Sequence, residues 1–289
     1  MKHIFFLFLS VVAISPFMGQ LKITQIHLNS GNHLTFFSPN TSLSNFNELA
    51  PNSTILGKDF SAFSQNELYP YFPTSYSNFV TNDASFKAIQ VGLKLPKHPA
   101  GTLRMGISTV RNNLLNTRGT YTQSFVVDTF VSVQNGSMIF ADSIVYQYYF
   151  GNYSNQQVRL DGAYVWEHEA GNRWAFTAGF GLSVGISYQS TTSLTYGESI
   201  NSYVVNNENQ GPSIYSGQYE SFTNKIAWGT TAYFPLGIGF KLGTKRAFWI
   251  PWMIYTELRP FLSMNSIPFQ PLRFSPGIGT ASGIRYTIK

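Results

Sequence analysis

Opposite charges stand two positions apart in segments where most other residues are uncharged. Glu257 is followed by Arg259, and Arg159 by Asp161, in a 289-residue sequence of which only 11% is charged. Side chains two positions apart on a β-strand point to the same face, about 7 Å apart. In a confined interior such charges would form an ion-pair network, whereas in a hydrated interior they would form a path for protons or small ions. We favour the network and keep the ion path as the alternative.

Histidine and serine are the other residues that could do chemistry. His27 and His33 share a parity and have Ser30 and Ser38 nearby, so a nucleophile with a histidine partner is conceivable at one rim. The other histidines after residue 20 are His98 and His168. No G-x-S-x-G, H-E-x-x-H, metal-ligand spacing or phosphate-binding loop accompanies them. We therefore predict no enzyme, no cofactor and no metal site, with a lipid- or lipopolysaccharide-modifying enzyme as the alternative.

The elements that must position these residues are long β-strands. Residues 173–188 read RWAFTAGFGLSVGISY, in which every second residue from Trp174 to Tyr188 is apolar. The alternate residues are mostly Gly, Ala, Ser and Thr. A period of two is typical of a strand, and this one lasts far beyond the usual five or six residues. Residues 226–242 and 274–288 repeat the pattern.

The two faces of these strands suit different surroundings. An apolar face with aromatic ends suits lipid, and a face of small residues suits a crowded interior, whereas the exposed face of a soluble sandwich is usually charged. An arginine facing lipid at the midplane would cost about 2–4 kcal/mol, so the charges are expected to face inward. We predict an all-β, antiparallel transmembrane β-barrel and keep a secreted β-sandwich as the alternative.

Turn residues divide the chain into eight predicted strands. Pro, Gly and Asn mark short connections at 97–101, 169–172 and 243–246, and longer connections alternate with them at 38–84, 113–143, 192–222 and 266–272. The predicted strands are 22–37, 85–96, 102–112, 144–168, 173–191, 223–242, 249–264 and 273–289. Short periplasmic turns and long extracellular loops are the layout of outer-membrane barrels.

The N-terminus and the composition predict export. Lys2, the apolar stretch 4–14 and Pro16 are typical of a secretory signal peptide, which we place at residues 1–19, leaving 20–289 as the barrel. No apolar run is long enough for a membrane-spanning helix. The chain has no cysteine, so it has no disulfide framework. We therefore predict the outer membrane of a Gram-negative cell envelope as the location.

Three segments carry a resemblance to a known group of proteins. The stretches RWAFTAGFGLSVGISY, YFPLGIGFKLG and GIGTASGIRYTIK resemble those of small outer-membrane β-barrel proteins of Bacteroidota-type Gram-negative bacteria. The resemblance covers residues 86–289 and is a pattern more than a strict motif. It implies a barrel fold. It implies no activity and no functional residues, because the members of that group share a barrel and not a known function.

Strand parity places a set of charges inside the predicted barrel. An eight-stranded barrel has just enough interior for side chains to fill, so we predict that these charges pair and close the lumen. On neighbouring strands, Arg285 is a reasonable partner for Glu257. The predicted lumenal network is Arg104, Arg159, Asp161, Glu257, Arg259 and Arg285, and Glu167 shares its parity.

The loops and the net charge bear on partners. The three long loops are acidic, while the basic residues behind the formal charge of +6 are scattered over turns and interior, so we expect no nucleic-acid partner. Outer-membrane lipid and lipopolysaccharide are the expected surroundings. We predict a non-enzymatic surface protein, whose loops bind an envelope protein or glycan or serve as a scaffold in envelope assembly.

Overall fold

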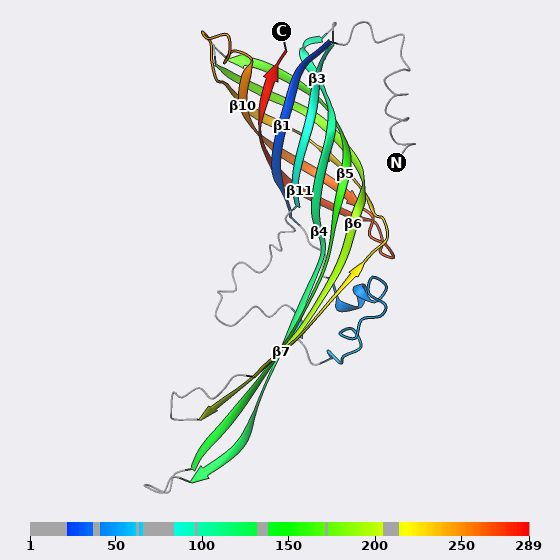
Figure 1. The fold of residues 1–289 in the computed structure, drawn as a ribbon, viewed down its shortest axis with the longest axis vertical. Coiled ribbons are helices and arrows are strands. Elements are labelled where there is room, and N and C mark those ends of the chain that lie inside the picture. The colour runs from blue at the N-terminus through cyan, green and yellow to red at the C-terminus, as the bar shows by residue number, and fades with distance from the viewer. Residues whose placement is uncertain are drawn as a thin grey trace.

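The chain forms a closed β-barrel from which a bundle of strands projects (Figure 1). The computed structural model describes residues 22–36, 41–61, 64–65, 84–95, 98–131, 138–170, 173–204 and 214–288. The predicted signal peptide and Ser38 lie outside the described residues. The strands are β1 (Lys22–Thr35), β2 (Ser64–Gln65), β3 (Ala84–Leu95), β4 (His98–Val131), β5 (Met138–Ala170), β6 (Trp174–Val204), β7 (Ile214–Thr223), β8 (Trp228–Tyr233), β9 (Leu236–Lys241), β10 (Trp252–Asn265) and β11 (Arg273–Thr287).

Antiparallel pairing closes the ring. The order is β1–β3–β4–β5–β6, then β8 and β9, then β10 and β11, and β11 returns to β1 through pairs that run from Gln25↔Thr287 to Thr35↔Gly277. Because β8 and β9 share one position between β6 and β10, the ring has eight positions. The predicted antiparallel transmembrane barrel is confirmed. Among the described residues, no helix is long and apolar enough to cross a membrane.

One predicted strand is interrupted where proline enters the ladder. The sequence predicts a single strand over 223–242, but β8 ends at Tyr233 and β9 begins at Leu236. Pro235 has no backbone N–H to donate, so the ladder cannot continue through it. The residues between β8 and β9 stay bound to β10, because the Phe234 N–H donates a hydrogen bond to the Pro260 carbonyl at 3.0 Å. The following connection, 242–251, is longer than the predicted turn at 243–246.

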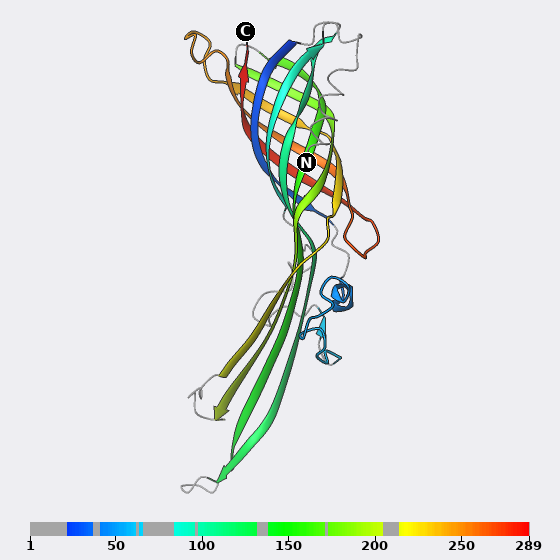
Figure 2. The ribbon, with the colours of Figure 1, turned by 45° about the vertical axis from the view of Figure 1, so that its right-hand side comes forward.

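The largest difference from the sequence prediction is a four-stranded ribbon. Residues 113–131 and 138–143 were predicted as loop, as were 192–204 and 214–222, yet they continue β4, β5 and β6 and form β7. Figures 1 and 2 show these strands leaving one end of the barrel together as a long, twisted projection. The prediction missed them because the ribbon alternates polar residues with tyrosines and has no continuous apolar face. Cross-strand pairs among the four strands continue the ladder beyond the barrel.

The outer and inner faces of the barrel differ as the alternation predicts. Large apolar side chains point outward around the ring, among them Ile89 at 62% exposed and Leu182 at 54%. Tryptophans cluster at the short-turn end of this surface, namely Trp166, Trp174, Trp249 and Trp252. The inner face carries buried polar and charged side chains instead. Glycines make room for them, because a Cβ at Gly237 would lie 2.8 Å from Glu257 Cγ.

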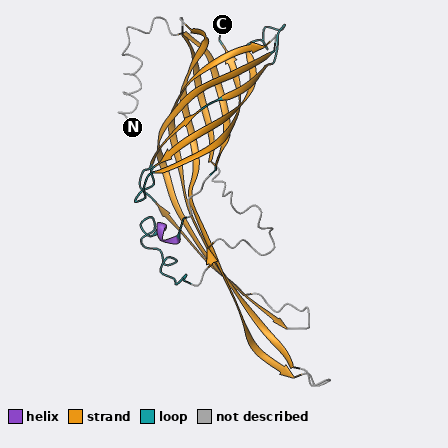
Figure 3. Cartoon of the chain, turned by 180° about the vertical axis from the view of Figure 1, so that it is seen from behind, coloured by secondary structure: helices purple, strands orange, loops and turns teal. Residues whose placement is uncertain are grey.

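A segment between β1 and β3 folds back over the long-loop end. Residues 41–61 contain the 3₁₀-helix η1 (Leu43–Phe46) and a series of turns, and we call them the cap segment (Figure 3). The cap segment packs against the inner face of the ribbon just beyond the barrel. Its buried cluster joins the cap segment to β4, β5, β6 and the β10–β11 connection, and its members are Phe46, Leu49, Ala50, Ile55, Leu115, Tyr153, Leu194, Tyr196 and Ile267.

Candidate functional site

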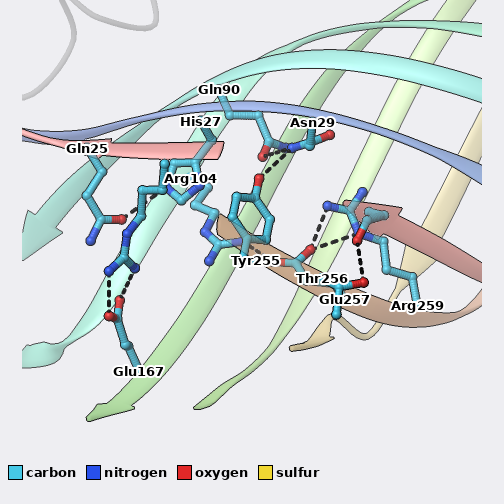
Figure 4. Close-up of polar contacts among 12 residues, drawn as sticks. Gln25, His27, Asn29, Gln90, Arg104, Glu167, Tyr255, Thr256, Glu257 and Arg259 are labelled. Carbon is cyan, nitrogen blue, oxygen red and sulfur yellow. Dashed lines mark hydrogen bonds and ion pairs between the residues drawn. The ribbon is translucent and has the colours of Figure 1, made fainter. Parts of the chain in front are cut away.

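The centre of the barrel interior is a carboxylate held by two arginines. Glu257 on β10 is 1% exposed. Its Oε2 accepts hydrogen bonds from Arg259 Nε at 3.0 Å and Nη2 at 2.7 Å, and its Oε1 accepts one from Arg104 Nη1 across the barrel (Figure 4). Arg259 shares the inward face because it lies two residues along the strand. Charge-assisted contacts of this kind are among the strongest hydrogen bonds in proteins, so the triad cross-links β4 to β10.

Aromatic rings fill the space around the two guanidinium groups. Arg259 lies 5.1 Å from the ring centre of Phe86 and 5.2 Å from that of Tyr233. Arg104 lies 5.7 Å from the ring of Tyr255. Rings at this distance attract a cation through their faces and exclude water from it. The triad is therefore enclosed by protein on the barrel axis.

A network of amides and hydroxyls lies beside this triad and includes Tyr233 and Tyr255, whose rings face the arginines. Asn29 donates to Gln90 Oε1 at 3.2 Å and to the Tyr255 hydroxyl at 3.1 Å. Gln90 in turn donates to Asp161 Oδ1 at 2.7 Å, and the Tyr233 hydroxyl donates to the same oxygen at 2.6 Å. Asp161 is thus held by neutral donors. The hydrogen bonds connect strands on different sides of the ring through its interior (Figure 4).

Arg285 lies nearer the short-turn end and pairs with a different acid from the predicted one. Its Nη1 and Nη2 donate to the two carboxylate oxygens of Glu167, at 2.6 Å and 2.8 Å. The prediction that it would pair with Glu257 is wrong because of the register of the neighbouring strands. Arg285 lies opposite Met253, whereas Glu257 lies opposite Ala281. Glu167 instead reaches it from β5.

Arg159 also departs from its predicted partners. It is 2% exposed, and its hydrogen bonds go to the neutral oxygens of Gln157, Thr231, Ser183 and Asn265. Asp161, two residues away, bonds elsewhere, so the structure does not join these two residues in an ion pair. All six predicted residues face inward, and Glu257, Arg104 and Arg259 are brought together.

His27 and His33 do not form a catalytic arrangement with each other or with Ser30. His27 is fully buried and bonds to Gln25 Oε1 at 3.0 Å. His33 packs against the rings of Phe86 and Phe261, with centres 4.8 Å and 4.7 Å away. Ser30 points to the outer face, away from both, since it has the opposite parity. Within the described ranges, no group of three or more His, Asp or Glu residues could hold a metal ion.

Polar contacts fix the cap segment at the long-loop end, and no pattern in the sequence predicted them. Glu220 on β7 accepts hydrogen bonds from Ser53 Oγ, from Thr54 N at 3.0 Å and from Thr54 Oγ1 at 2.5 Å. Burial raises the pKa of Glu220, but these hydrogen bonds outweigh that effect and leave the pKa below its ordinary value. Asn224 donates to the Leu49 carbonyl at 2.7 Å. In the sequence, Glu220 was one acidic loop residue among several.

The arrangement therefore fills the barrel interior with ion pairs and hydrogen-bonded polar groups, and the cap segment lies at its long-loop end. No protein-family model matches the sequence, and no curated protein matches it either. Among solved structures, the chain is similar to the translocator domain of the autotransporter NalP from Neisseria meningitidis, with 8% identity, a TM-score of 0.18 and coverage of 99% of this chain and 95% of that one.

Two further solved structures are similar in the same limited sense. Pseudomonas putida OprB has 7% identity and a TM-score of 0.13, with 92% of this chain and 94% of that one covered. A Pseudomonas aeruginosa FadL homologue has 10% identity and a TM-score of 0.16, with coverages of 93% and 90%. At such scores the likeness carries no argument about function. The fold assignment comes from the ring of strand pairs itself.

Proposed function

We propose that this chain is an outer-membrane anchor that holds a β-ribbon outside the cell to bind an envelope protein or glycan. The short-turn end would face the periplasm, and the cap segment and ribbon would face outward. The apolar outer surface and the tryptophans at the short-turn end support insertion in a bilayer. Placing the long segments outside follows the usual layout of such barrels.

The ribbon is the observation that carries a binding role. The pairing of β3 with β4 ends at Arg111, whereas β4 and β5 remain paired to Val131. Residues 112–131 span about 60 Å at roughly 3.3 Å per residue, which is twice the thickness of a bilayer core. A membrane anchor does not need strands that extend so far beyond the bilayer. We therefore propose that the ribbon serves to reach a partner.

The surface of the ribbon suits recognition by stacking and by strand pairing. Tyr215 and Tyr219 on β7 are 64% and 69% exposed and share one face. Tyrosine presents a flat apolar ring and a hydroxyl, which suits both sugar rings and peptide surfaces. Beyond the barrel, β4 pairs along its outer edge only with β2 among the described strands, which leaves backbone groups available for a partner strand.

The interior favours a role other than transport. Glu257, Glu167 and their arginines occupy the barrel axis, and the cap segment covers the long-loop end. A route for solutes would require these ion pairs to separate inside a low-dielectric space, which is costly. We therefore propose that the network is a structural plug.

Binding by the ribbon can be tested on cells that display the protein. A variant with Tyr215→Ser and Tyr219→Ser, and a second variant that lacks residues 120–148, should reach the membrane but lose binding to envelope extracts and glycan arrays. Phe248→Ser is the matched control, because Phe248 is equally exposed, at 67%, but lies at the short-turn end. Undiminished binding by both ribbon variants would refute the proposal.

A further inference from the structure

A small cavity lies inside the barrel between Arg159 and the cap segment. Its volume is about 30 Å³, and its wall contains Arg159, Arg273, His33 and Thr35 together with amide and hydroxyl side chains. Leu114 belongs both to this wall and to the residues that pack against the cap cluster. The cavity therefore adjoins, through Leu114, the cluster that packs against the cap segment.

Two cations face this cavity without an acid in hydrogen-bond or salt-bridge contact. Arg159 is 2% exposed, and each oxygen that it contacts is neutral. The Nη1 atom of Arg273 is buried and has no hydrogen-bond partner among the described residues. None of the salt bridges between described residues includes either arginine. A buried charge without a partner is costly, so something of opposite charge is expected nearby.

The charge balance of the interior points the same way. Five arginines face inward, namely Arg104, Arg159, Arg259, Arg273 and Arg285, against three carboxylates, Asp161, Glu167 and Glu257. Two positive charges are therefore left over. Glu257 and Glu167 bind three of the arginines and Asp161 is held by neutral donors, so neither arginine at the cavity has a carboxylate hydrogen-bonded to it.

A second unpartnered group faces the same space. The Oγ1 atom of Thr35 is buried and has no hydrogen-bond partner among the described residues. A guanidinium can only donate hydrogen bonds, and a hydroxyl can donate one. Both groups are thus suited to an acceptor that sits between them.

We propose that this cavity binds a small inorganic anion of the halide class, held by the guanidinium groups of Arg159 and Arg273. A cavity needs about 10–15 Å³ for one water, so this one has room for a halide together with a water. The small volume favours a monatomic anion over organic acids such as gluconate. The bound anion neutralises part of the excess charge of the interior.

Bromide provides a direct test on the intact protein. Crystals grown in bromide should show an anomalous scattering peak in contact with both Arg159 and Arg273. Cavity density accounted for by water, with anomalous peaks only at the molecular surface, would overturn the proposal.

A stability measurement provides the second test. In detergent, the unfolding temperature should be at least about 2 °C higher in chloride than in gluconate at equal ionic strength, because gluconate cannot enter the cavity. Arg273→Gln should abolish the difference between the salts. The control Arg246→Gln, which removes an exposed cation from the short-turn end, should retain it. Equal unfolding temperatures of the parent protein in both salts would overturn the proposal even if Arg273→Gln does not fold.

Discussion

Replacing Glu257 by glutamine tests how strongly the central ion pairs hold the barrel together. The substitution keeps the size of the side chain and removes the only charge that lies between Arg104 and Arg259. Removing one partner of a buried ion pair typically costs about 3–5 kcal/mol. For a domain of this size that corresponds to a fall of about 10 °C in unfolding temperature. Membrane insertion should persist, since the outer surface is unchanged.

The assay is thermal unfolding in detergent, followed by gel mobility and circular dichroism. Glu169→Gln is the matched control, because Glu169 also pairs with a cation, Lys241 at 2.7 Å, but its side chain is 56% exposed. An exposed pair contributes at most about 1 kcal/mol, so the control should lose no more than about 3 °C. Adding Arg104→Gln to Glu257→Gln should recover part of the loss. If the unfolding temperature of Glu257→Gln lies within about 1–2 °C of that of the parent protein, the triad does not stabilise the barrel. That result would refute the reasoning.

Three further predictions follow from the same contacts. Planar-bilayer recordings of the intact protein should show no large steady conductance, because ion pairs and the cap segment close the lumen; a stable open channel would contradict the plug. The protein should fractionate with the outer membrane, and protease added to intact cells should cut within 38–84 or 192–222 while sparing Lys245; cleavage at Lys245 in sealed cells would invert the topology. The cap segment should open as the pH falls below the ordinary carboxyl range: the pKa of Glu220 is lower in the folded protein, so its contribution is complete above the unfolded pKa and is lost on protonation. Hydrogen exchange of residues 41–61 measures this opening, and Glu220→Gln should remove its pH dependence.

The alternation of apolar and small residues was sufficient to predict the barrel and the facing of its charges. A strand has a side-chain period of two, so once one residue of 173–188 faces lipid, the orientation of all others follows. Arg104, Arg159 and Glu257 could be assigned to the interior by parity in the same way, since charge is disfavoured on the lipid side. The orientation of each side chain depends only on its position along its own strand, so the local sequence is enough to predict it.

The extent of the ribbon was not predictable from that pattern. Residues 112–131 have no apolar stripe to mark them as strand, because no lipid or core lies against most of their length. Their conformation depends on pairing with β5, the next strand along the chain, and that pairing leaves no apolar period in the sequence of either strand. The cap segment was missed for a related reason, since its cluster draws Phe46, Leu115 and Ile267 from separate parts of the chain.

The sequence by itself thus determined the barrel, its apolar exterior and the inward position of the charges, because each depends on the period of one strand. Only the tertiary structure decided which charges meet. Partner choice depends on the stagger between strands and on reach across the lumen, so Arg285 bonds to Glu167, while Glu257 receives both Arg104 and Arg259. The same stagger leaves Arg159 and Arg273 facing a cavity without a carboxylate, which no spacing in the chain could have shown.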